Sequence, residues 1–193
     1  MKEMKKQLNL VKPEKKIYQS SIGSLVSDTT GDILYIPAIA QGDATGERIG
    51  NSVRMYGFSY RVVVSANTGG SSNDQQNVRI MLVQDNDPVG GAVPTVVEIL
   101  DTATLGSLPL VSNADRFKIL HDRICAVSKA SVDNKRVNWC TGSYNYKGLY
   151  QKFTGASNST QIKRNHYLVI FGDMATANAP TSTGAVRLEY TDA

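Results

Sequence analysis

The sequence contains no long apolar run. No stretch of about 18 or more apolar residues occurs, so no membrane-spanning helix is expected. The N-terminus also lacks the apolar segment of 7–15 residues that follows the basic start of a secretory signal. We therefore expect a protein made and kept in a cytosol-like compartment. A length of 193 residues suits one sizeable core better than two.

Cysteine and histidine are scarce, at two residues each. In a reducing compartment Cys125 and Cys140 are expected to be free thiols, with a single disulfide as the alternative. His121 and His166 are far apart and belong to no cluster with metal-ligand spacing. The motifs GxSxG, GxxxxGK[ST], GxGxxG and HExxH are all missing. The sequence therefore predicts a protein that is not an enzyme.

Two short stretches offer weak alternatives. In "HDR" (121–123) a histidine precedes an aspartate, but neighbours on a strand point to opposite faces and do not form a dyad. In "QDNDP" (84–88), Asp85, Asn86 and Asp87 carry hard oxygens that suit calcium. Asp and Asn before Pro are also ordinary turn formers, and a turn is the preferred interpretation.

What the sequence does contain is a strongly segregated charge. Residues 1–16 hold six of the 21 basic and two of the 17 acidic side chains, so the other 177 residues hold 15 of each. The net charge of +4 thus lies entirely in the first sixteen residues. Such an arm favours nucleic acid as a partner, because lysines neutralise phosphates without reading bases. A solubilising terminus is the alternative. The nucleic-acid-binding candidates are Lys2, Lys5, Lys6, Lys12, Lys15 and Lys16.

Beyond the arm, residues 17–31 are rich in Ser, Thr and Gly and are interpreted as a flexible tether. The remainder, 32–193, alternates between strand patterns and turn residues. Strands are expected at 32–40, 52–64, 78–85, 116–128, 136–146, 166–174 and 185–193, with Pro37 confining the first to a sheet edge or a bend. Residues 78–85 and 166–174 are apolar on both faces, as in buried central strands. This pattern predicts an all-β sandwich or jelly roll.

One segment has helical spacing instead. In "PTVVEILDTATL" (94–105), Thr95 and Glu98 form the T-x-x-E pattern of a capping box. We expect one short helix at about 95–104, followed by a long loop over 101–115 that lies at subunit contacts.

Several stretches resemble the satellite tobacco necrosis virus coat proteins. They are "VPTVVEILDTATLGSLPLVSNADRFKILHD" (93–122), "IAQGDATGERIGNSVRMYGFSYRV" (39–62), "VRIMLVQDN" (78–86) and the terminal "EYTDA" (189–193). The resemblance is diffuse from about 130 to 185. The Gln-Gly and Arg-x-Gly-Asn order is also similar to capsid proteins of small circular single-stranded DNA viruses.

The resemblance implies an eight-stranded jelly roll of two four-stranded antiparallel sheets. Sixty copies would build a T=1 icosahedral shell around a single-stranded RNA or DNA genome, made in the host cytoplasm and found in the virion. It also implies calcium between subunits, for which Asp192 and, more loosely, Glu14 are the matching ligands. No other cofactor is implied.

The arm departs from this family in one respect, because it is shorter, lacks arginine and includes two acids. Sixty arms supply only about +240 against one charge per nucleotide, so basic residues of the body are expected to share the task. The alternative function is a cellular β-sandwich binding module with an incidental basic tail, which would sediment as a monomer or small oligomer.

Overall fold

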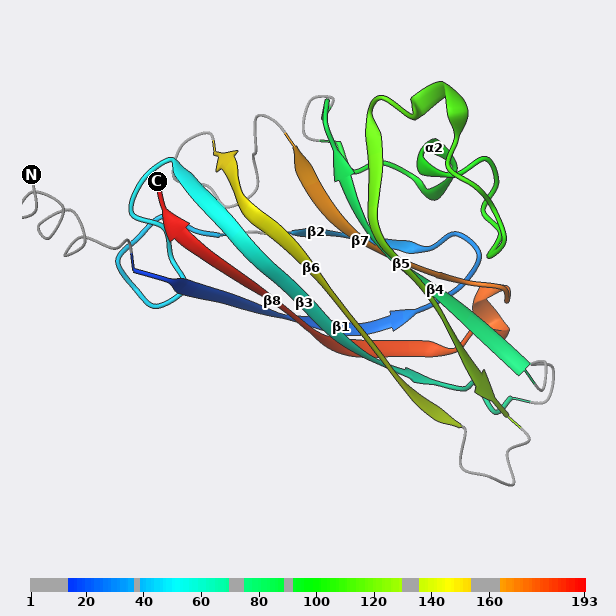
Figure 1. Cartoon of the computed structure of the whole chain (residues 1–193). Coiled ribbons are helices and arrows are strands. Elements are labelled where there is room, and N and C mark those ends of the chain that lie inside the picture. Colours follow the sequence, from blue (N-terminus) through cyan, green and yellow to red (C-terminus); the bar gives the residue numbers. More distant parts are fainter. Residues whose placement is uncertain (1–13, 37–38, 70–74, 89–91, 130–135, 154–163) are drawn as a thin grey trace, which may run out of the picture.

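The computed structural model has eight strands in two antiparallel four-stranded sheets, which confirms the predicted jelly roll (Figure 1). It describes residues 14–36, 39–69, 75–88, 92–129, 136–153 and 164–193. The first sheet has the order β1-β8-β3-β6 and the second β2-β7-β4-β5. The strands are β1 (Lys16–Val26), β2 (Asp32–Ile36), β3 (Ser52–Ser65), β4 (Gln75–Asp85), β5 (Phe117–Ser128), β6 (Val137–Lys152), β7 (Asn165–Gly172) and β8 (Thr181–Asp192). Among the described residues, no helix is long and apolar enough to cross a membrane.

The main core lies between the two sheets. On β3 it takes Phe58, Tyr60, Val62 and Val64, which share one face of the alternating stretch 52–64. A strict alternation would put Met55 on the opposite face, yet Met55 is fully buried as well. A β-bulge between Met55 and Gly57 shifts the register against both neighbouring strands. One extra residue reverses the faces on either side of it.

The prediction of a flexible tether at 17–31 is wrong, because most of this segment forms strand β1. Residues 16–26 pair with β8 along their whole length, with a bulge at Ser21–Gly23. Tyr18, Ile22 and Leu25 pack on the main core. An edge strand gains its hydrogen bonds through the backbone, so serine-rich composition did not prevent pairing. The sheet sandwich therefore begins at Lys16 and not at residue 32.

The turn after β1 is also well structured. The carboxylate of Asp28 accepts hydrogen bonds from the N–H and hydroxyl of Thr30, from the N–H of Gly31 and from the hydroxyl of Thr176. Burial alone would raise the pKa of Asp28, but these hydrogen bonds outweigh it and lower the pKa to about 2. Gly31 has a φ of 75°, and a Cβ there would press on Phe171 and Val96. This turn fixes β1 and β2 in opposite sheets.

The outer face of the second sheet is covered by the β4–β5 connection. There Val96, Ile99 and Leu100 pack on Met81, Val83, Val169 and Phe171 in a second apolar cluster. The strands β4 and β7 therefore lie between two cores, which confirms the prediction that both of their faces are apolar. All eight residues of β7 are buried.

The helix in this connection, α2 (Val96–Ile99), is shorter than the expected 95–104. Glu98 accepts hydrogen bonds from the N–H and hydroxyl of Thr95, as the capping pattern predicts. Leu100 is extended and bridges to Pro109. The chain therefore turns back on itself after one helical turn. The described residues also form two short 3-10 helices, η1 (Val111–Asn113) and η2 (Thr176–Asn178).

A disulfide joins Cys125 and Cys140, so the expectation of free thiols is wrong. Cys125 lies on β5 and Cys140 on β6, which are edge strands of different sheets. The two edges lie together, and the Cα atoms are 6.2 Å apart, within the range that a disulfide spans. Compartment arguments from sequence could not detect this proximity. The bond ties the two sheets together at one side of the sandwich.

Pro37 follows directly after β2, which is an edge strand that ends at Ile36. The predicted restriction to a sheet edge is confirmed, while residues 37–38 themselves lie outside the described residues.

Candidate nucleic-acid interface

The predicted arm lysines fall into two groups. Lys2, Lys5, Lys6 and Lys12 lie outside the described residues. Lys15 is exposed, and its Nζ lies 5.8 Å from the centre of the Tyr56 ring. Lys16 is the first residue of β1, and its Nζ lies 2.8 Å from Asp192 Oδ2 and donates to the carbonyl of Glu47. Lys16 is thus engaged within the fold by Asp192 and Glu47.

Asp192 and Glu14, the candidate calcium ligands, do not form a cation site within one chain. One Asp192 oxygen accepts from Lys16 and the other from the N–H of Ile49, while Glu14 is exposed. The part of the chain that the structure describes contains no group of three or more His, Cys, Asp or Glu side chains arranged to hold a metal. A divalent ion at Asp192 would have to displace the Lys16 ammonium. The donor set therefore fits an internal ion pair better than calcium.

We expect assembled particles to melt at the same temperature with and without a calcium chelator, because Lys16 already neutralises Asp192. Lys16→Met should lower the free energy of unfolding by about 0.5–1 kcal/mol, as for other partly exposed ion pairs. Differential scanning calorimetry measures both effects. A drop in melting temperature on chelation that disappears in Asp192→Asn would restore calcium to this position.

Among the residues that the structure describes, no element covers the outer face of the first sheet, unlike that of the second sheet. We call its outward side chains the open face. The strand registers place Arg61 beside Thr141 and Ala185, and Arg187 beside Ser59 and Gln19. Trp139 lies outward on β6 and is 58% exposed. The sequence signal for these positions is the alternation of 52–64, which puts Arg61 on the face opposite to Tyr60 and Val62. The same alternation applied to 137–143 would have placed Trp139 there.

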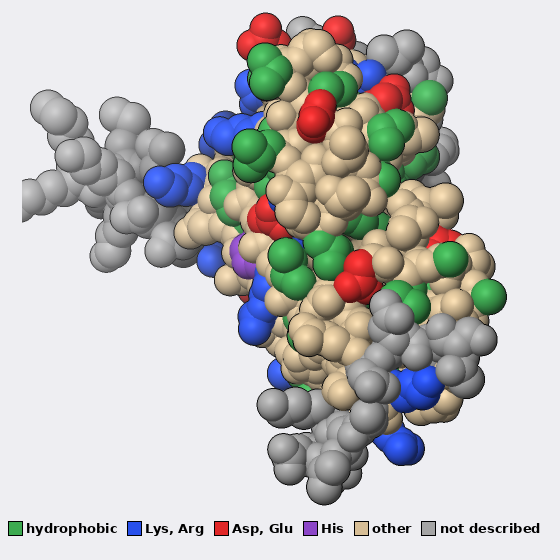
Figure 2. Space-filling view, turned by 90° about the vertical axis from the view of Figure 1, so that its right-hand side faces the viewer, with side chains coloured by type: hydrophobic (Ala, Val, Ile, Leu, Met, Phe, Trp, Pro, Cys, Tyr) green, Lys and Arg blue, Asp and Glu red, His purple; other side chains and the backbone are tan. Residues whose placement is uncertain are grey.

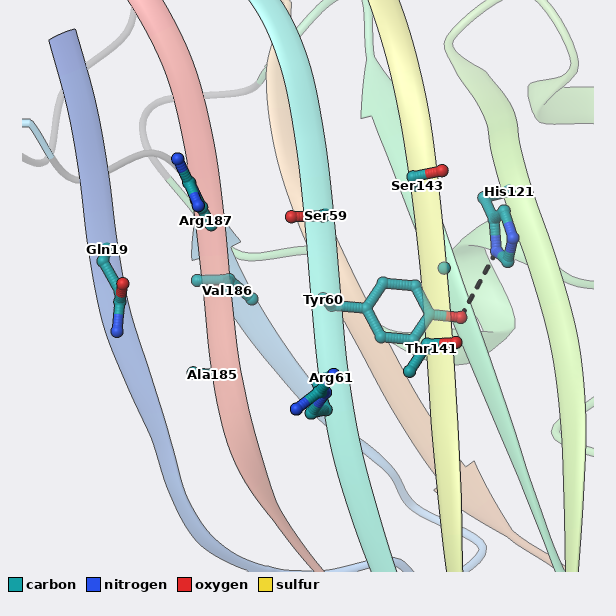
Figure 3. A pocket seen from close by; sticks show the side chains of 11 residues that line it. Gln19, Ser59, Tyr60, Arg61, His121, Thr141, Ser143, Ala185, Val186 and Arg187 are labelled. Carbon is teal, nitrogen blue, oxygen red and sulfur yellow. Dashed lines mark hydrogen bonds between the residues drawn. The ribbon is translucent and has the colours of Figure 1, made fainter.

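A hollow of about 770 Å³ opens on this face (Figure 3). Figure 3 shows Arg187 and Arg61 on neighbouring strands with Ser59 nearby, and hydroxyl side chains of β6 along the far side. The lining residues are Gln19, Ser59, Tyr60, Arg61, His121, Thr141, Gly142, Ser143, Ala185, Val186 and Arg187. This lining contains two arginines and no carboxylate. Its chemistry therefore suits an anionic ligand.

One end of the hollow is closed by a pair of rings. The Tyr60 hydroxyl lies 3.3 Å from His121 Nδ1, and the two rings meet edge to face. Burial raises the pKa of Tyr60 to about 12, so the phenol stays protonated at neutral pH. Gly142 allows this contact, because a Cβ there would collide with both rings.

The structure also shows the two stretches for which the sequence left alternatives, "HDR" (121–123) and "QDNDP" (84–88). Asp122 turns away from His121 and pairs with Arg79, with oxygen–nitrogen distances of 2.6 and 2.9 Å. Asp85 is fully buried and receives two hydrogen bonds from Arg116. Neither a His-Asp dyad nor a calcium loop is formed at these positions.

The surface view shows where positive charge gathers. In Figure 2, several lysine and arginine side chains lie along the left flank next to a histidine, and a few others lie at the lower and upper right among acidic and apolar side chains. The lining of the hollow likewise contains a histidine, His121, together with Arg61 and Arg187.

Comparisons with known proteins give one family match. The family model of the satellite tobacco necrosis virus coat protein matches residues 2–193. A search of curated protein sequences gave no significant match. Among solved structures, a desmodium yellow mottle tymovirus chain is 13% identical, with a TM-score of 0.38, and covers 92% of this chain and 88% of its own. A trichodysplasia spinulosa-associated polyomavirus VP1 chain is 6% identical, with a TM-score of 0.25, at coverages of 92% and 94%.

At these TM-scores the structural matches add nothing to the assignment, which rests on the family model. That model spans nearly the whole length, including the diffuse part at 130–185 and the basic arm. The chain belongs to the satellite tobacco necrosis virus coat protein family.

Proposed function

We propose that this coat protein assembles as sixty copies into a T=1 icosahedral shell around a single-stranded nucleic acid. The observation that carries the proposal is the difference between the two sheets. The second sheet is covered by the β4–β5 connection, whereas the first is open, with arginines and hydroxyls on its surface. The arm continues from β1, an edge strand of the open sheet. Because β1, the strand that follows the arm in the sequence, belongs to this open sheet, we assign the open face to the shell interior.

The charge distribution supports this arrangement. The body carries equal numbers of basic and acidic side chains, so identical neighbours can pack without net repulsion. The positive charge of the arm is placed where phosphates would be enclosed, and lysines contact phosphate without base specificity. The genome can be RNA or DNA on these grounds. The virion is the place of action, after synthesis in the host cytoplasm.

A cellular binding module, the alternative function, has no specific observation in its favour. The family assignment covers the arm as well as the sandwich, so the basic tail is part of the family pattern and is not incidental.

The experiment that tests the proposal compares the full chain with a variant lacking residues 2–13. This deletion spares Lys16, which pairs with Asp192, and so leaves β1 intact. We expect both proteins to sediment as uniform large particles. Negative-stain images should show these particles as shells. The deletion should reduce packaged nucleic acid, measured as the ratio of absorbance at 260 and 280 nm.

Sedimentation of the full chain as a monomer or small oligomer under all conditions would contradict the shell. Equal nucleic-acid content in the two proteins at low salt would instead remove the arm from packaging. Arm contacts should also weaken as salt rises, because phosphate binding releases counterions.

A further inference from the structure

Trp139 is the only tryptophan of the chain, and its indole is more exposed than buried. It lies on a regular strand, opposite Val63 of β3 in the sheet register. Large aromatic side chains usually contribute to a core or an interface. An indole held outward on a rigid sheet is therefore available to a ligand with a flat face.

Arg61 connects this indole to the hollow. Its guanidinium carbon lies 5.5 Å from the centre of the Trp139 ring, and the same side chain lines the hollow. Arg187 lies diagonally across from Arg61 on β8, at the distance of about 7–8 Å that separates such neighbours. Glu189 is 3.9 Å from Arg187, at the limit of an ion pair, and both side chains are about half exposed. The two arginines thus leave most of their positive charge to solvent.

Hydroxyl groups complete the surface. Ser59 lies beside Arg187 on the strand of Arg61, and Thr141 and Ser143 lie opposite Arg61 and Ser59 on the edge strand β6. Hydroxyls, like backbone amides, donate to phosphate oxygens and sugars in nucleic-acid complexes. Aromatic, cationic and hydroxyl groups thus lie side by side on one rigid sheet.

We propose that Trp139 and Arg61 form a stacking platform for an unpaired base, and that the adjoining hollow holds the phosphates of the same strand between Arg61 and Arg187. The occupant is single-stranded nucleic acid, because a base within a duplex cannot lie on an exposed indole. The site selects for single strands without reading sequence, since every base has a flat face.

This inference rests on the proposed function and extends it, because it assigns genome contacts to named residues of the body. The chemistry favours nucleic acid over a second copy of the chain. The lining is polar with two arginines and no carboxylate, so an occupant that carries a negative charge at every unit of its chain complements it, as the phosphates of a single strand do. The arm's small net charge also leaves room for a second binding element.

Trp139 provides its own reporter, because no other tryptophan contributes to the fluorescence. Dissociated full-length protein is titrated at low salt with a 20-nucleotide oligo(dT) and, separately, oligo(U). We expect saturable quenching of the tryptophan emission with both. Arg61→Gln should weaken the affinity about five- to tenfold, as expected when one part of a stacking site is lost.

The sheet offers a matched control. Arg54 and the exposed Tyr150 pair on the same two strands, at the other end of the open face. Arg54→Gln removes the same charge and should leave the quenching unchanged. Trp139→Leu and Tyr150→Leu are compared by anisotropy of a fluorescein-labelled oligonucleotide, and only the first should weaken binding. Circular dichroism of each variant is the control for folding.

Two results would overturn this inference while leaving the shell intact. Oligonucleotide binding with unchanged emission, and with equal affinity in Trp139→Leu, would assign binding to the arm alone. A blue shift on assembly of nucleic-acid-free protein, without quenching by oligonucleotide, would place Trp139 at a contact between copies. Failure to form shells at all would be seen in the electron micrographs and concerns the proposed function instead.

Discussion

Reduction of the disulfide between Cys125 and Cys140 should lower the free energy of unfolding by about 3 kcal/mol at 25 °C, as expected for a closed loop of about 15 residues. The separation along the chain is 15 residues, and the bond joins the edge strands of two different sheets. Without it, the unfolded chain gains conformational freedom. Urea denaturation of dissociated subunits, with and without a thiol reductant, measures the difference.

The matched control is the double variant Cys125→Ala and Cys140→Ala. Both sulfur-bearing side chains are buried, so the variant also loses some packing and should be no more stable than the reduced protein. Its denaturation midpoint should not respond to reductant. If oxidised and reduced wild-type protein unfold at the same urea concentration, the bond does not stabilise the fold.

Acid should destabilise the fold through His166. This side chain is fully buried on β7, and neither ring nitrogen has a hydrogen-bond partner among the described residues. Burial, together with the positive charge of Arg164, lowers the pKa of His166 to about 3. The unfolded chain, with an ordinary pKa of about 6.5, takes up the proton first. Stability is therefore greatest above pH 6.5 and falls as the pH drops toward 3.

The expected loss is about 1.4 kcal/mol per pH unit in this window, or on the order of 2 kcal/mol between pH 7.5 and pH 5. Urea denaturation at a series of pH values measures it. Asp28 acts in a lower window, because its pKa of about 2 makes its contribution fade only below about pH 4. The range from pH 7.5 to 5 therefore isolates the histidine.

His166→Phe should flatten this pH dependence, because phenylalanine can keep the edge-to-face contact that His166 makes with Tyr146. The variant and the wild-type protein are compared over the same series of pH values. A wild-type slope that persists in His166→Phe would show that other groups bind the proton.

Alternation predicted seven of the eight strands and the class of fold. It failed where backbone pairing or an irregularity decides the outcome. Strand β1 is serine-rich, and its place in the sheet depends on β8, which lies at the other end of the sequence. The bulge at Met55 moves the side chains before it to the opposite face of the sheet, which a strict period of two cannot predict. Helix α2 ends early because Leu100 pairs with Pro109.

The candidate site was predictable in its chemistry and not in its contacts. Lys16 and Asp192 were assigned to different ligands, although the fold brings them together as an ion pair. The two cysteines were predicted to be free thiols because of the expected compartment. Their disulfide forms because the fold brings the edge strands β5 and β6 together. Trp139 and Arg61 each follow the outward alternation, but only the register places them next to each other. Long-range pairing of strands is the information that single positions do not contain.

The ion pair between the start of β1 and the end of β8 has a consequence for engineering these particles. Both ends of the described chain are fixed at the same end of the molecule, and the Ser52 hydroxyl also donates to the carbonyl of Ala193 (Figure 1). In the proposed shell, a peptide or enzyme fused after Ala193 would start close to Lys16, where the arm joins the fold. It would be carried inside as cargo and would not be displayed to antibodies or receptors. Display would instead require insertion in the connection that covers the second sheet.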